Sequence, residues 1–359
     1  MVGKIMVACW HPSRMLAIVV LLSGGNAALN HRLIAMTPPG SVVRESPIEA
    51  RLERVTRIWD KDPHSAFTDL IWWKDRFVCV FRAGSNHVSD DGTLQLLSSE
   101  DGQHWDKMVR LSSRDSDLRD PKILVGTDNE LYILASKTQR GKQQLTHQST
   151  LWEVKKNLDG KGWSTCVEIG EPDSWLWRIT RHKSGYYGWG YGTNKERFIR
   201  LYKSPTGQRF DPITPKLLAD TGYPNETAMI MEGDQAWCLL RRDGKAPRNT
   251  ALLGTAKAPF TEWTWRDLGV QIGGPAMLRL PSGQFLVTVR LYDAPKVRTA
   301  LCQLDVEHGK LKELLTLPSS GDSSYAGMVW HQQKLWISYY SSHETKSSIY
   351  FAEVDIKQE

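Results

Sequence analysis

The chain has 359 residues, of which 40% are hydrophobic and 24% are charged, and its formal net charge is +6. This is the composition of a globular protein with a packed core, and closed all-β folds of this length commonly form one domain. The Lys and Arg residues form no concentrated basic run, and the five Cys residues show no metal-ligand spacing. The sequence therefore predicts no nucleic-acid partner, no metal site and no cofactor.

The first 28 residues have the pattern of a secretory signal peptide. Lys4 and Arg14 precede the apolar run 15–22, and small residues follow it. The run is too short to cross a bilayer as a helix, so no membrane-spanning segment is expected. We therefore expect a secreted or periplasmic protein in which residues 29–50 form an N-terminal extension. The alternative is a disordered tail.

A pattern of about fifty residues recurs six times: a polar or aromatic anchor, an apolar stretch, a tight turn and a second apolar stretch. The anchors are His64, Asp120, Trp175, Glu226, Pro275 and Tyr325, at separations of 56, 55, 51, 49 and 50 residues. Each unit predicts a hairpin and leaves room for two more strands. We therefore predict an all-β, six-bladed β-propeller over residues 51–359, with residues 51–60 completing the last blade. A solenoid or two β-sandwiches would not explain six equal units.

One turn pattern occurs twice in this frame. Ser99–Trp105 has the form S-x-D-G-x-x-W, and Ser204–Phe210 repeats it with Thr in place of Asp. The Asp side chain can accept hydrogen bonds from backbone N–H groups of its own turn, and Gly supplies a positive φ. We expect a structural role for this turn, with its closing aromatic ring packed under the hairpin.

In a propeller, the innermost strand of each blade lies along the central channel, so the residues where these strands begin surround one mouth of it. These residues include His64, Asp69, Arg119, Asp120, Trp177, Arg178, Asn225, Glu226 and Tyr325. Each alone could be a solvated strand end. Polar groups are costly to bury unpaired, so their recurrence at corresponding places predicts a shared pocket.

The last unit resembles the part of a sialidase that carries the nucleophilic tyrosine. The similarity lies in Gly321–Met328, which is followed by a turn and the strand 335–340. It implies that Tyr325 is the nucleophile and that the chain is a sialidase-like propeller, with the resemblance extending over about residues 60–356. The S-x-D-G-x-x-W turn is also typical of such propellers.

Two other segments resemble sialidase segments. Asn225-Glu226, followed by a hairpin that ends in Arg241-Arg242, is similar to the segment with the carboxylate partner of the tyrosine and one substrate-binding arginine. This implies Glu226 as the base and Arg241 as a ligand of the substrate carboxylate. Arg242 is the alternative, because a slip of one residue exchanges the two faces of a strand. A segment entering a strand of the fifth unit implies a further carboxylate-binding arginine, Arg298.

These residue types suit an acidic sugar with a carboxylate beside its anomeric carbon. A carboxylate nucleophile would be repelled by that charge, whereas a neutral tyrosine would not, and a neighbouring glutamate can take its proton. Arginines can bind the substrate carboxylate in bidentate geometry. Tyrosine nucleophiles are a recognised exception to the two-carboxylate rule of glycosidases, and the two-step path retains configuration.

The sequence departs from the sialidase pattern in two places. Sialidases normally open the first blade with Arg-Ile-Pro, but His64–Leu70 contains no arginine. A substitute is left open among Arg82, Arg119 and Arg178. The usual acid, an aspartate after the first hairpin, is matched by His87, and histidine can act as an acid near neutral pH. The acid is left open among His87, Asp90, Asp91 and Asp69.

Four segments also resemble a bacterial sialidase-like subfamily: 81–87, 117–121, 175–178 and 339–343. Arg119 beside Asp120 is interpreted equally well as a structural ion bridge, and alternation directs only one of Trp175 and Trp177 toward the channel. The predicted substrate-binding set is Arg241, Arg298, Arg82, Arg119, Asp120, Arg178, Trp177, His64 and Asn225.

The sequence thus predicts a monomeric, retaining exo-glycosidase whose partner is a carbohydrate, either a sialylated glycan or another acidic glycan. One alternative is a glycosidase of the same fold that acts on a different sugar. The other is a non-catalytic carbohydrate-binding propeller. The presence of both Tyr325 and Glu226 argues against a purely binding protein, which has no need of an activated tyrosine.

Overall fold

The structure, a computed structural model, describes residues 48–114, 116–140, 145–154, 166–293 and 296–358. In these residues all regular structure is β-strand, arranged as six four-stranded antiparallel sheets. The described residues include no helix of the length and apolarity that crossing a membrane requires. The expected signal peptide, and the extension up to residue 47, lie outside the described residues, so secretion stays a prediction.

The sheets follow one another along the chain, each with its four strands in sequence order. The first contains β2 (His64–Trp73), β3 (Arg76–Gly84), β4 (Thr93–Ser99) and β5 (Asp106–Leu111). The second contains β6 (Asp117–Val125), β7 (Leu131–Arg140), β8 (Leu145–Val154) and β9 (Val167–Ile169). The third contains β10 (Ser174–His182), β11 (Gly185–Gly192), β12 (Ile199–Ser204) and β13 (Asp211–Pro212).

The remaining sheets repeat the arrangement, with one change at the end of the chain. The fourth contains β14 (Tyr223–Glu232), β15 (Gln235–Asp243), β16 (Leu252–Lys257) and β17 (Thr264–Asp267). The fifth contains β18 (Ile272–Arg279), β19 (Phe285–Leu291), β20 (Arg298–Asp305) and β21 (Lys310–Thr316). The sixth contains β22 (Ser323–His331), β23 (Lys334–Ser341), β24 (Ser348–Gln358) and β1 (Ile48–Trp59).

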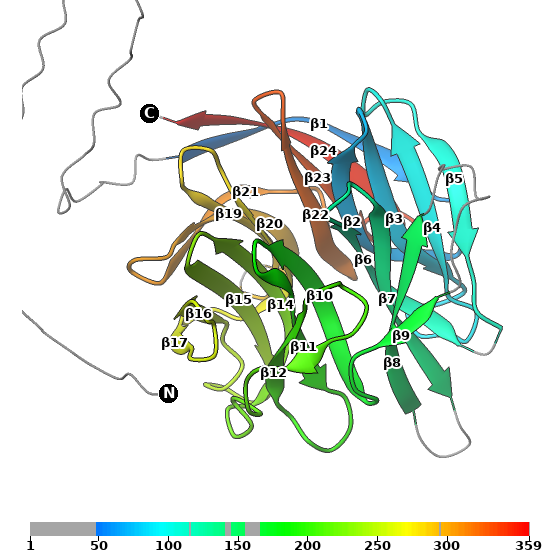
Figure 1. Cartoon of the computed structure of the whole chain (residues 1–359). Coiled ribbons are helices and arrows are strands. Elements are labelled where there is room, and N and C mark those ends of the chain that lie inside the picture. The colour runs from blue at the N-terminus through cyan, green and yellow to red at the C-terminus, as the bar shows by residue number, and fades with distance from the viewer. Residues whose placement is uncertain (1–47, 115, 141–144, 155–165, 294–295, 359) are drawn as a thin grey trace, which may run out of the picture. The chain divides into compact units, whose positions relative to one another are not determined.

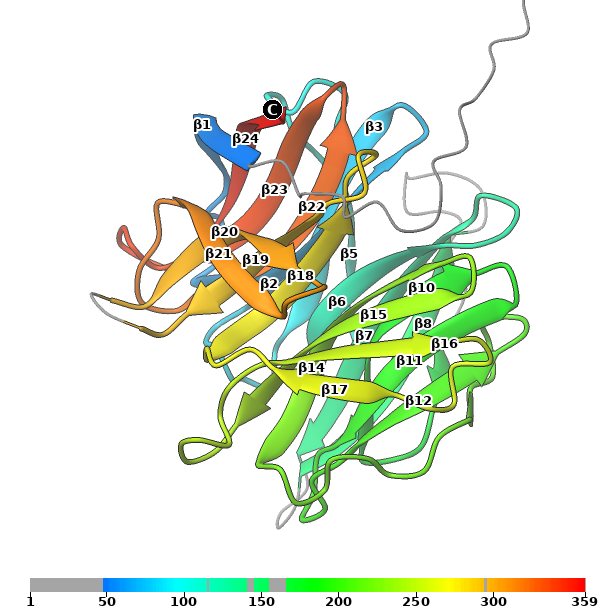
Figure 2. The ribbon, with the colours of Figure 1, turned by 90° about the vertical axis from the view of Figure 1, so that its left-hand side faces the viewer.

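Strand β1 closes the ring. It pairs antiparallel with β24, from Ile48 opposite Gln358 to Trp59 opposite Ile349, so the first and last strands share one sheet (Figure 1). This confirms that residues 51–60 complete the last blade. The innermost strands contact one another in the cyclic order β2, β6, β10, β14, β18, β22 and back to β2, with the sheets fanning outward from them (Figure 2). The predicted six-bladed β-propeller is therefore confirmed, and closure leaves few exposed sheet edges.

Each innermost strand carries a β-bulge at the same level. The pairing with the second strand of the blade is interrupted between Ala66 and Asp69, Arg119 and Lys122, Leu176 and Arg178, Pro224 and Thr227, Gly273 and Ala276, and Ser324 and Gly327. Within these bulges φ is positive at Phe67 (61°), Asp120 (48°), Gly274 (53°) and Tyr325 (51°). A bulge re-aims side chains, and backbone held at positive φ in non-glycine residues often marks a functional site.

The turn Ser99–Trp105 has the structure that its sequence predicts. Asp101 Oδ1 accepts hydrogen bonds from the backbone N–H groups of Gln103 and His104, at 2.8 and 2.9 Å. Gly102 has a φ of 71°. The Trp105 ring packs edge-on against Phe351, with ring centroids 4.9 Å apart. The turn therefore ties the first blade to the last.

Candidate active site

Two bulges bring Tyr325 and Glu226 together. Tyr325 Oη donates a hydrogen bond of 2.6 Å to Glu226 Oε1, although the residues are 99 positions apart in the chain. Both are buried, with 8% and 7% of their surfaces exposed. The second carboxylate oxygen of Glu226 accepts a 2.9 Å hydrogen bond from the backbone N–H of Gly274, in the bulge of the blade between them. A side chain on residue 274 would meet the Tyr325 ring, since a Cβ atom there would lie 2.8 Å from Tyr325 Cδ2.

Arg241 joins this pair from the end of β15. Its Nη1 donates to Glu226 Oε1 and to Tyr325 Oη, at 2.8 Å in each case. Its Nε donates to Asp243, which also accepts a hydrogen bond from the Asn225 amide. Arg242 faces away and donates to Thr250 and Asp267. Of the two arginines considered from the sequence, Arg241 is the one beside Tyr325.

The pKa shifts of the pair leave the proton on the tyrosine. Burial raises the pKa of Tyr325 well above its usual value, and the charge of Glu226 raises it further. Burial also raises the pKa of Glu226, but the Arg241 charge and the hydrogen bonds from Tyr325, Arg241 and Gly274 outweigh this effect and lower it. The resting state is therefore a phenol that donates to an ionised carboxylate, the arrangement needed for a nucleophile with an adjacent base.

A second arginine beside Tyr325 is Arg290, at the end of β19. Its guanidinium carbon lies 5.4 Å from the Tyr325 ring centroid. It donates to Tyr340 Oη at 3.1 Å and to Asp322 Oδ1 at 3.3 Å. The sequence analysis did not single out Arg290. Its position at the end of the second strand of the fifth blade, equivalent to that of the Arg241-Arg242 pair in the fourth, is the signal that could have found it.

Arg298, in contrast, is not brought to this group. It begins β20, one strand further from the channel than Arg290. Its guanidinium donates to Glu313 at 2.6 Å and to Asp293 at 3.0 Å. The expectation that Arg298 lies in the group around Tyr325 is therefore wrong, because β20 is the third strand of its blade and does not line the channel.

Two of the possible replacements for the missing first arginine are already bound to acidic partners. Arg82 is fully buried and donates to Asp117 at 2.8 Å, to the backbone carbonyl of residue 86 and to Ser89 Oγ. Arg178 forms a bidentate ion pair with Asp69, at 3.1 Å for each bond. Asp69 also accepts a 2.8 Å hydrogen bond from the backbone N–H of residue 123. Both carboxylate oxygens of Asp69 are thus held by Arg178, and one of them also by a backbone N–H group.

Arg119 is less constrained. Its guanidinium carbon lies 5.4 Å from the Phe67 ring centroid, and the Phe67 and Tyr325 centroids are 5.1 Å apart. Arg119 Nε lies 3.7 Å from Asp120 Oδ2 and has no hydrogen-bond partner although it is buried. Burial raises the pKa of Asp120, even though the charge of Arg119 opposes this. Arg119 Nη1 also lies 3.9 Å from Asp117 Oδ2, so Arg119 stands between two carboxylates without the short bidentate pairing of Arg178.

Trp177 also lies next to Tyr325, with ring centroids 6.0 Å apart. It occupies the bulge of β10, whereas Trp175 stacks on Tyr191. Trp177 Nε1 is buried without a hydrogen-bond partner. Of the two tryptophans, Trp177 is the one whose ring contacts Tyr325. The bulge at Trp177 separates them, and not alternation, because residues two apart share a face in a regular strand.

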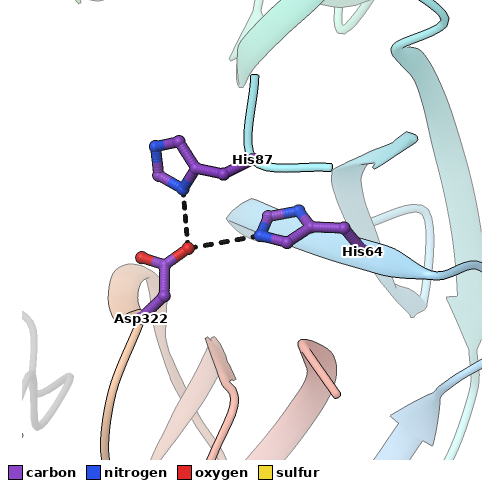
Figure 3. A group of neighbouring side chains, drawn as sticks. All are labelled: His64, His87 and Asp322. Carbon is purple, nitrogen blue, oxygen red and sulfur yellow. Dashed lines mark hydrogen bonds and ion pairs between the residues drawn. The ribbon is translucent and has the colours of Figure 1, made fainter. Parts of the chain in front are cut away.

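The two histidines singled out from the sequence meet at a residue that the sequence did not indicate. His87 Nδ1 lies 2.6 Å and His64 Nε2 lies 3.2 Å from the same atom, Asp322 Oδ2 (Figure 3). Their ligand-type atoms all lie within 4.8 Å of one another. Both histidine nitrogens lie at hydrogen-bond distance from Asp322 Oδ2, so this oxygen lies between the two rings. Asp90 and Asp91 are exposed in the loop after β3, where Asp91 accepts hydrogen bonds from Ser85.

No protein-family profile matches the sequence, and no curated protein matches it. Solved structures do match. A Dyadobacter fermentans protein of unknown function has a TM-score of 0.75 at 17% identity, covering 86% of this chain and 99% of that one. A Penicillium chrysogenum α-L-arabinanase complexed with arabinobiose has a TM-score of 0.64 at 10% identity, covering 84% and 98%. A Trypanosoma rangeli sialidase in complex with the inhibitor DANA has a TM-score of 0.58 at 14% identity, covering 86% of this chain and 60% of that one.

These likenesses establish the fold. At such identities they place the chain among six-bladed propellers whose solved members include sialidases and arabinanases, both of which are glycoside hydrolases. They do not transfer a substrate or a mechanism, because one fold carries many chemistries. The function has to be argued from the site.

Proposed function

We propose that the chain is a retaining, exo-acting glycoside hydrolase that acts on sialic acid or a related acidic sugar, with Tyr325 as nucleophile and Glu226 as its base. The proposal is carried by the buried 2.6 Å hydrogen bond from Tyr325 Oη to Glu226 Oε1, with Arg241 donating to both oxygens. A buried charge is costly unless it is paired and hydrogen-bonded, and the Glu226 carboxylate has both kinds of partner beside the Tyr325 hydroxyl. Nucleophile, base and an orienting cation are therefore all present.

The reaction would proceed in two steps. In the first, Glu226 takes the phenolic proton as Tyr325 Oη forms a bond to the anomeric carbon. The bond from that carbon to the leaving oxygen breaks, and an acid protonates that oxygen. In the second, the conjugate base of that acid takes a proton from water. The water oxygen then displaces Tyr325 from the anomeric carbon, and the phenol regains its proton from Glu226. Two displacements at one carbon retain its configuration.

The acidic substrate class is supported by the cations around the pair. Arg241 donates a hydrogen bond to Tyr325, and Arg290 lies beside the Tyr325 ring. Arg119 lies beside the Phe67 ring, which contacts Tyr325. Arginine binds carboxylates through two parallel N–H groups, and a neutral tyrosine avoids the repulsion that a carboxylate nucleophile would meet. In this proposal Trp177 and Asn225 shape the pocket, while Asp120 contacts the sugar.

A second candidate is a glycosidase of the same fold that acts on a neutral sugar through two carboxylates. One observation favours it. Burial raises the pKa of Asp120, whereas the pKa of nearby Glu226 is lowered by Arg241 and hydrogen bonds that outweigh burial. Carboxyl groups whose pKa values are pushed apart are the usual acid and base of a glycosidase. An α-L-arabinofuranosidase of Fusarium graminearum is among the structural neighbours, with a TM-score of 0.62 and 11% identity.

The test is hydrolysis of a panel of fluorogenic glycosides, sialosides and arabinofuranosides included, by the wild type and by Tyr325→Phe. We expect release from the sialoside and a loss of about 10³-fold or more in the variant, because the nucleophile is removed. The matched control is Tyr339→Phe, which removes a hydroxyl that donates to the carbonyl of Pro318. Turnover of an arabinofuranoside alone would favour the second candidate. Sugar binding without any turnover would favour a carbohydrate-binding propeller.

A further inference from the structure

The two departures from the sialidase pattern are joined in space. His64 begins the segment in which the first arginine is expected, and His87 stands where the acid is expected. Both contact Asp322, which precedes Tyr325 by three residues (Figure 3). Each departure was found on its own in the sequence, at positions 23 residues apart. The two segments that depart from the sialidase pattern therefore meet at one carboxylate oxygen.

The hydrogen bonds fix where the protons lie. Asp322 Oδ1 accepts from Tyr340 Oη at 2.6 Å and from Arg290 Nη2 at 3.3 Å, and Oδ2 faces the two histidines. Burial alone would raise the pKa of Asp322, but hydrogen bonds from His64, His87 and Tyr340 lower it far below its usual range. Asp322 is therefore an ionised acceptor, and His87 must donate to it through Nδ1–H.

This leaves Nε2 of His87 as the nitrogen that can exchange a proton with a ligand. The side chain of His87 is 47% exposed, compared with 12% for His64. The His87 ring packs edge-on against the Phe67 ring, with centroids 5.1 Å apart. The centroid of the Tyr325 ring lies at the same distance from that of Phe67. His87 is thus one ring away from the buried nucleophile, on a part of the site that remains open.

The aspartates considered as the proton donor are less open to a ligand or less well oriented than His87. Asp69 is closed off by Arg178, and Asp91 accepts hydrogen bonds from the Ser85 backbone and hydroxyl. Asp90 is exposed in the loop after β3, whereas Asp120 is buried in the same mouth as Tyr325 and is the strongest rival. It has no orienting carboxylate of the kind that Asp322 provides for His87.

We propose that His87 is the proton donor to the leaving oxygen, acting through Nε2, and that Asp322 is its positioning residue. The assignment rests on the proposed function and completes its acid–base cycle. In the first step the Nε2 proton moves to the glycosidic oxygen as its bond to the anomeric carbon breaks. In the second step neutral Nε2 takes a proton from the attacking water, which regenerates the imidazolium. An imidazole held by a carboxylate through its other nitrogen is a common form of general acid and base.

The surroundings of His87 hold its ring in place. Asp322 faces it from the β21–β22 connection, His64 faces it from β2, and the Phe67 ring covers one edge.

The experiment compares two substrates that share a sugar and differ in leaving group: 4-methylumbelliferyl sialoside, which needs little protonation, and sialyllactose, which needs full protonation. For His87→Gln we expect kcat/KM for sialyllactose to fall by about 10²–10⁴-fold, and less than about tenfold for the aryl sialoside. For Asp322→Asn we expect kcat/KM to fall more for sialyllactose than for the aryl sialoside, as in His87→Gln. Both losses should be smaller than in His87→Gln.

The control is His104→Gln. His104 forms a His–Asp pair of similar length outside the site, with Nδ1 at 2.7 Å from Asp101 Oδ2. We expect both substrates to be cleaved as by the wild type. Equal losses on the two substrates in His87→Gln would show a structural role and overturn the assignment. So would leaving-group dependence that appears in Asp120→Asn and not in His87→Gln. A wild type that cleaves neither sialoside would overturn sialic acid as the substrate of the proposed function, independently of the role of His87.

A measurement independent of turnover tests the positioning role. Nitrogen-15 NMR of the histidine rings reports which nitrogen carries the proton in the neutral form. We expect His87 to be the Nδ1–H tautomer in the wild type and to lose that preference in Asp322→Asn. An Nε2–H tautomer in the wild type would contradict the geometry on which the assignment stands.

Discussion

The two halves of the channel mouth use the same residue types in different ways. In the half formed by β14–β24, Arg241 donates to both Glu226 and Tyr325, and Arg290 lies against the Tyr325 ring. In the half formed by β2–β12, Arg82 and Arg178 are bound to single carboxylates, Asp117 and Asp69. A position near the channel is therefore not enough to make an arginine part of the site. What decides its role is whether its partners leave it able to bind a ligand.

The comparison also separates catalysis from stability. A charge shared with a reactive group should affect the rate when removed, whereas a charge bound to one buried partner should affect folding. The following predictions test that separation.

The largest effect is expected for Glu226→Gln. The amide cannot take the proton of Tyr325, so kcat/KM should fall by about 10²–10⁴-fold. Steady-state hydrolysis of the sialoside measures this. The control is Glu313→Gln, whose carboxylate accepts from Arg298 outside the site. Retention of more than a tenth of wild-type activity by Glu226→Gln would show that Glu226 is not the base.

On the other half, Arg82→Met should cost stability. Both Arg82 and Asp117 have fully buried side chains, so the substitution removes the hydrogen-bonded partner of the Asp117 carboxylate and leaves it with Arg119 Nη1 at 3.9 Å. Breaking a buried ion pair in this way costs about 3–5 kcal/mol. Denaturant unfolding measures the free energy, and the double variant Arg82→Met with Asp117→Leu should recover most of the loss. A change below about 1 kcal/mol in the single variant would mean that water or another donor replaces Arg82.

The pair Arg290→Lys and Arg298→Lys compares an arginine beside Tyr325 with one in the outer half of the same blade. Hydrogen bonds to charged groups contribute about 1.5–3 kcal/mol, so losing them to the substrate carboxylate should lower kcat/KM by about 10–100-fold in Arg290→Lys. Arg298→Lys should leave it unchanged. The reverse result would restore Arg298 to the role expected from the sequence.

The smallest effect concerns stability in acid. Burial raises the pKa values of Asp322 and Glu226, but hydrogen bonds and the Arg241 charge outweigh it and lower both. As pH falls, the unfolded chain binds these protons first, so the stabilisation is present above the ordinary carboxyl pKa of about 4 and is lost below it. The free energy of unfolding, followed from pH 7 to pH 3, should therefore fall less steeply in Asp322→Asn. An unchanged slope would show that the pKa of Asp322 is not lowered.

The sequence allowed much of the architecture to be predicted, because each blade has its own hairpin and the six hairpins recur at nearly equal spacing. Tyr325, Glu226 and Arg241 could be selected together because each belongs to a recognisable segment. The bulges could not be predicted, since one extra residue in a strand leaves no clear mark in an apolar pattern.

Arg290 and Asp322 were missed for related reasons. Arg290 lies opposite Gly273 beside a bulge of the fifth blade. The sequence analysis selected Arg298 instead, which begins the next strand of that blade. Asp322 lies just before β22, in a stretch of small polar residues typical of a connection. Its importance comes from His64 and His87, which are more than 230 positions away in the chain, and contacts of that range leave no local signal.

The most direct test of the account is to trap the covalent intermediate. Incubation with 2,3-difluorosialic acid, proteolysis and mass spectrometry would locate the sugar on the chain. The account predicts time-dependent inactivation, with one sugar bound to the peptide that contains Tyr325 and none in Tyr325→Phe. A sugar bound to Glu226 or Asp120, or sialoside turnover without any labelled peptide, would contradict it.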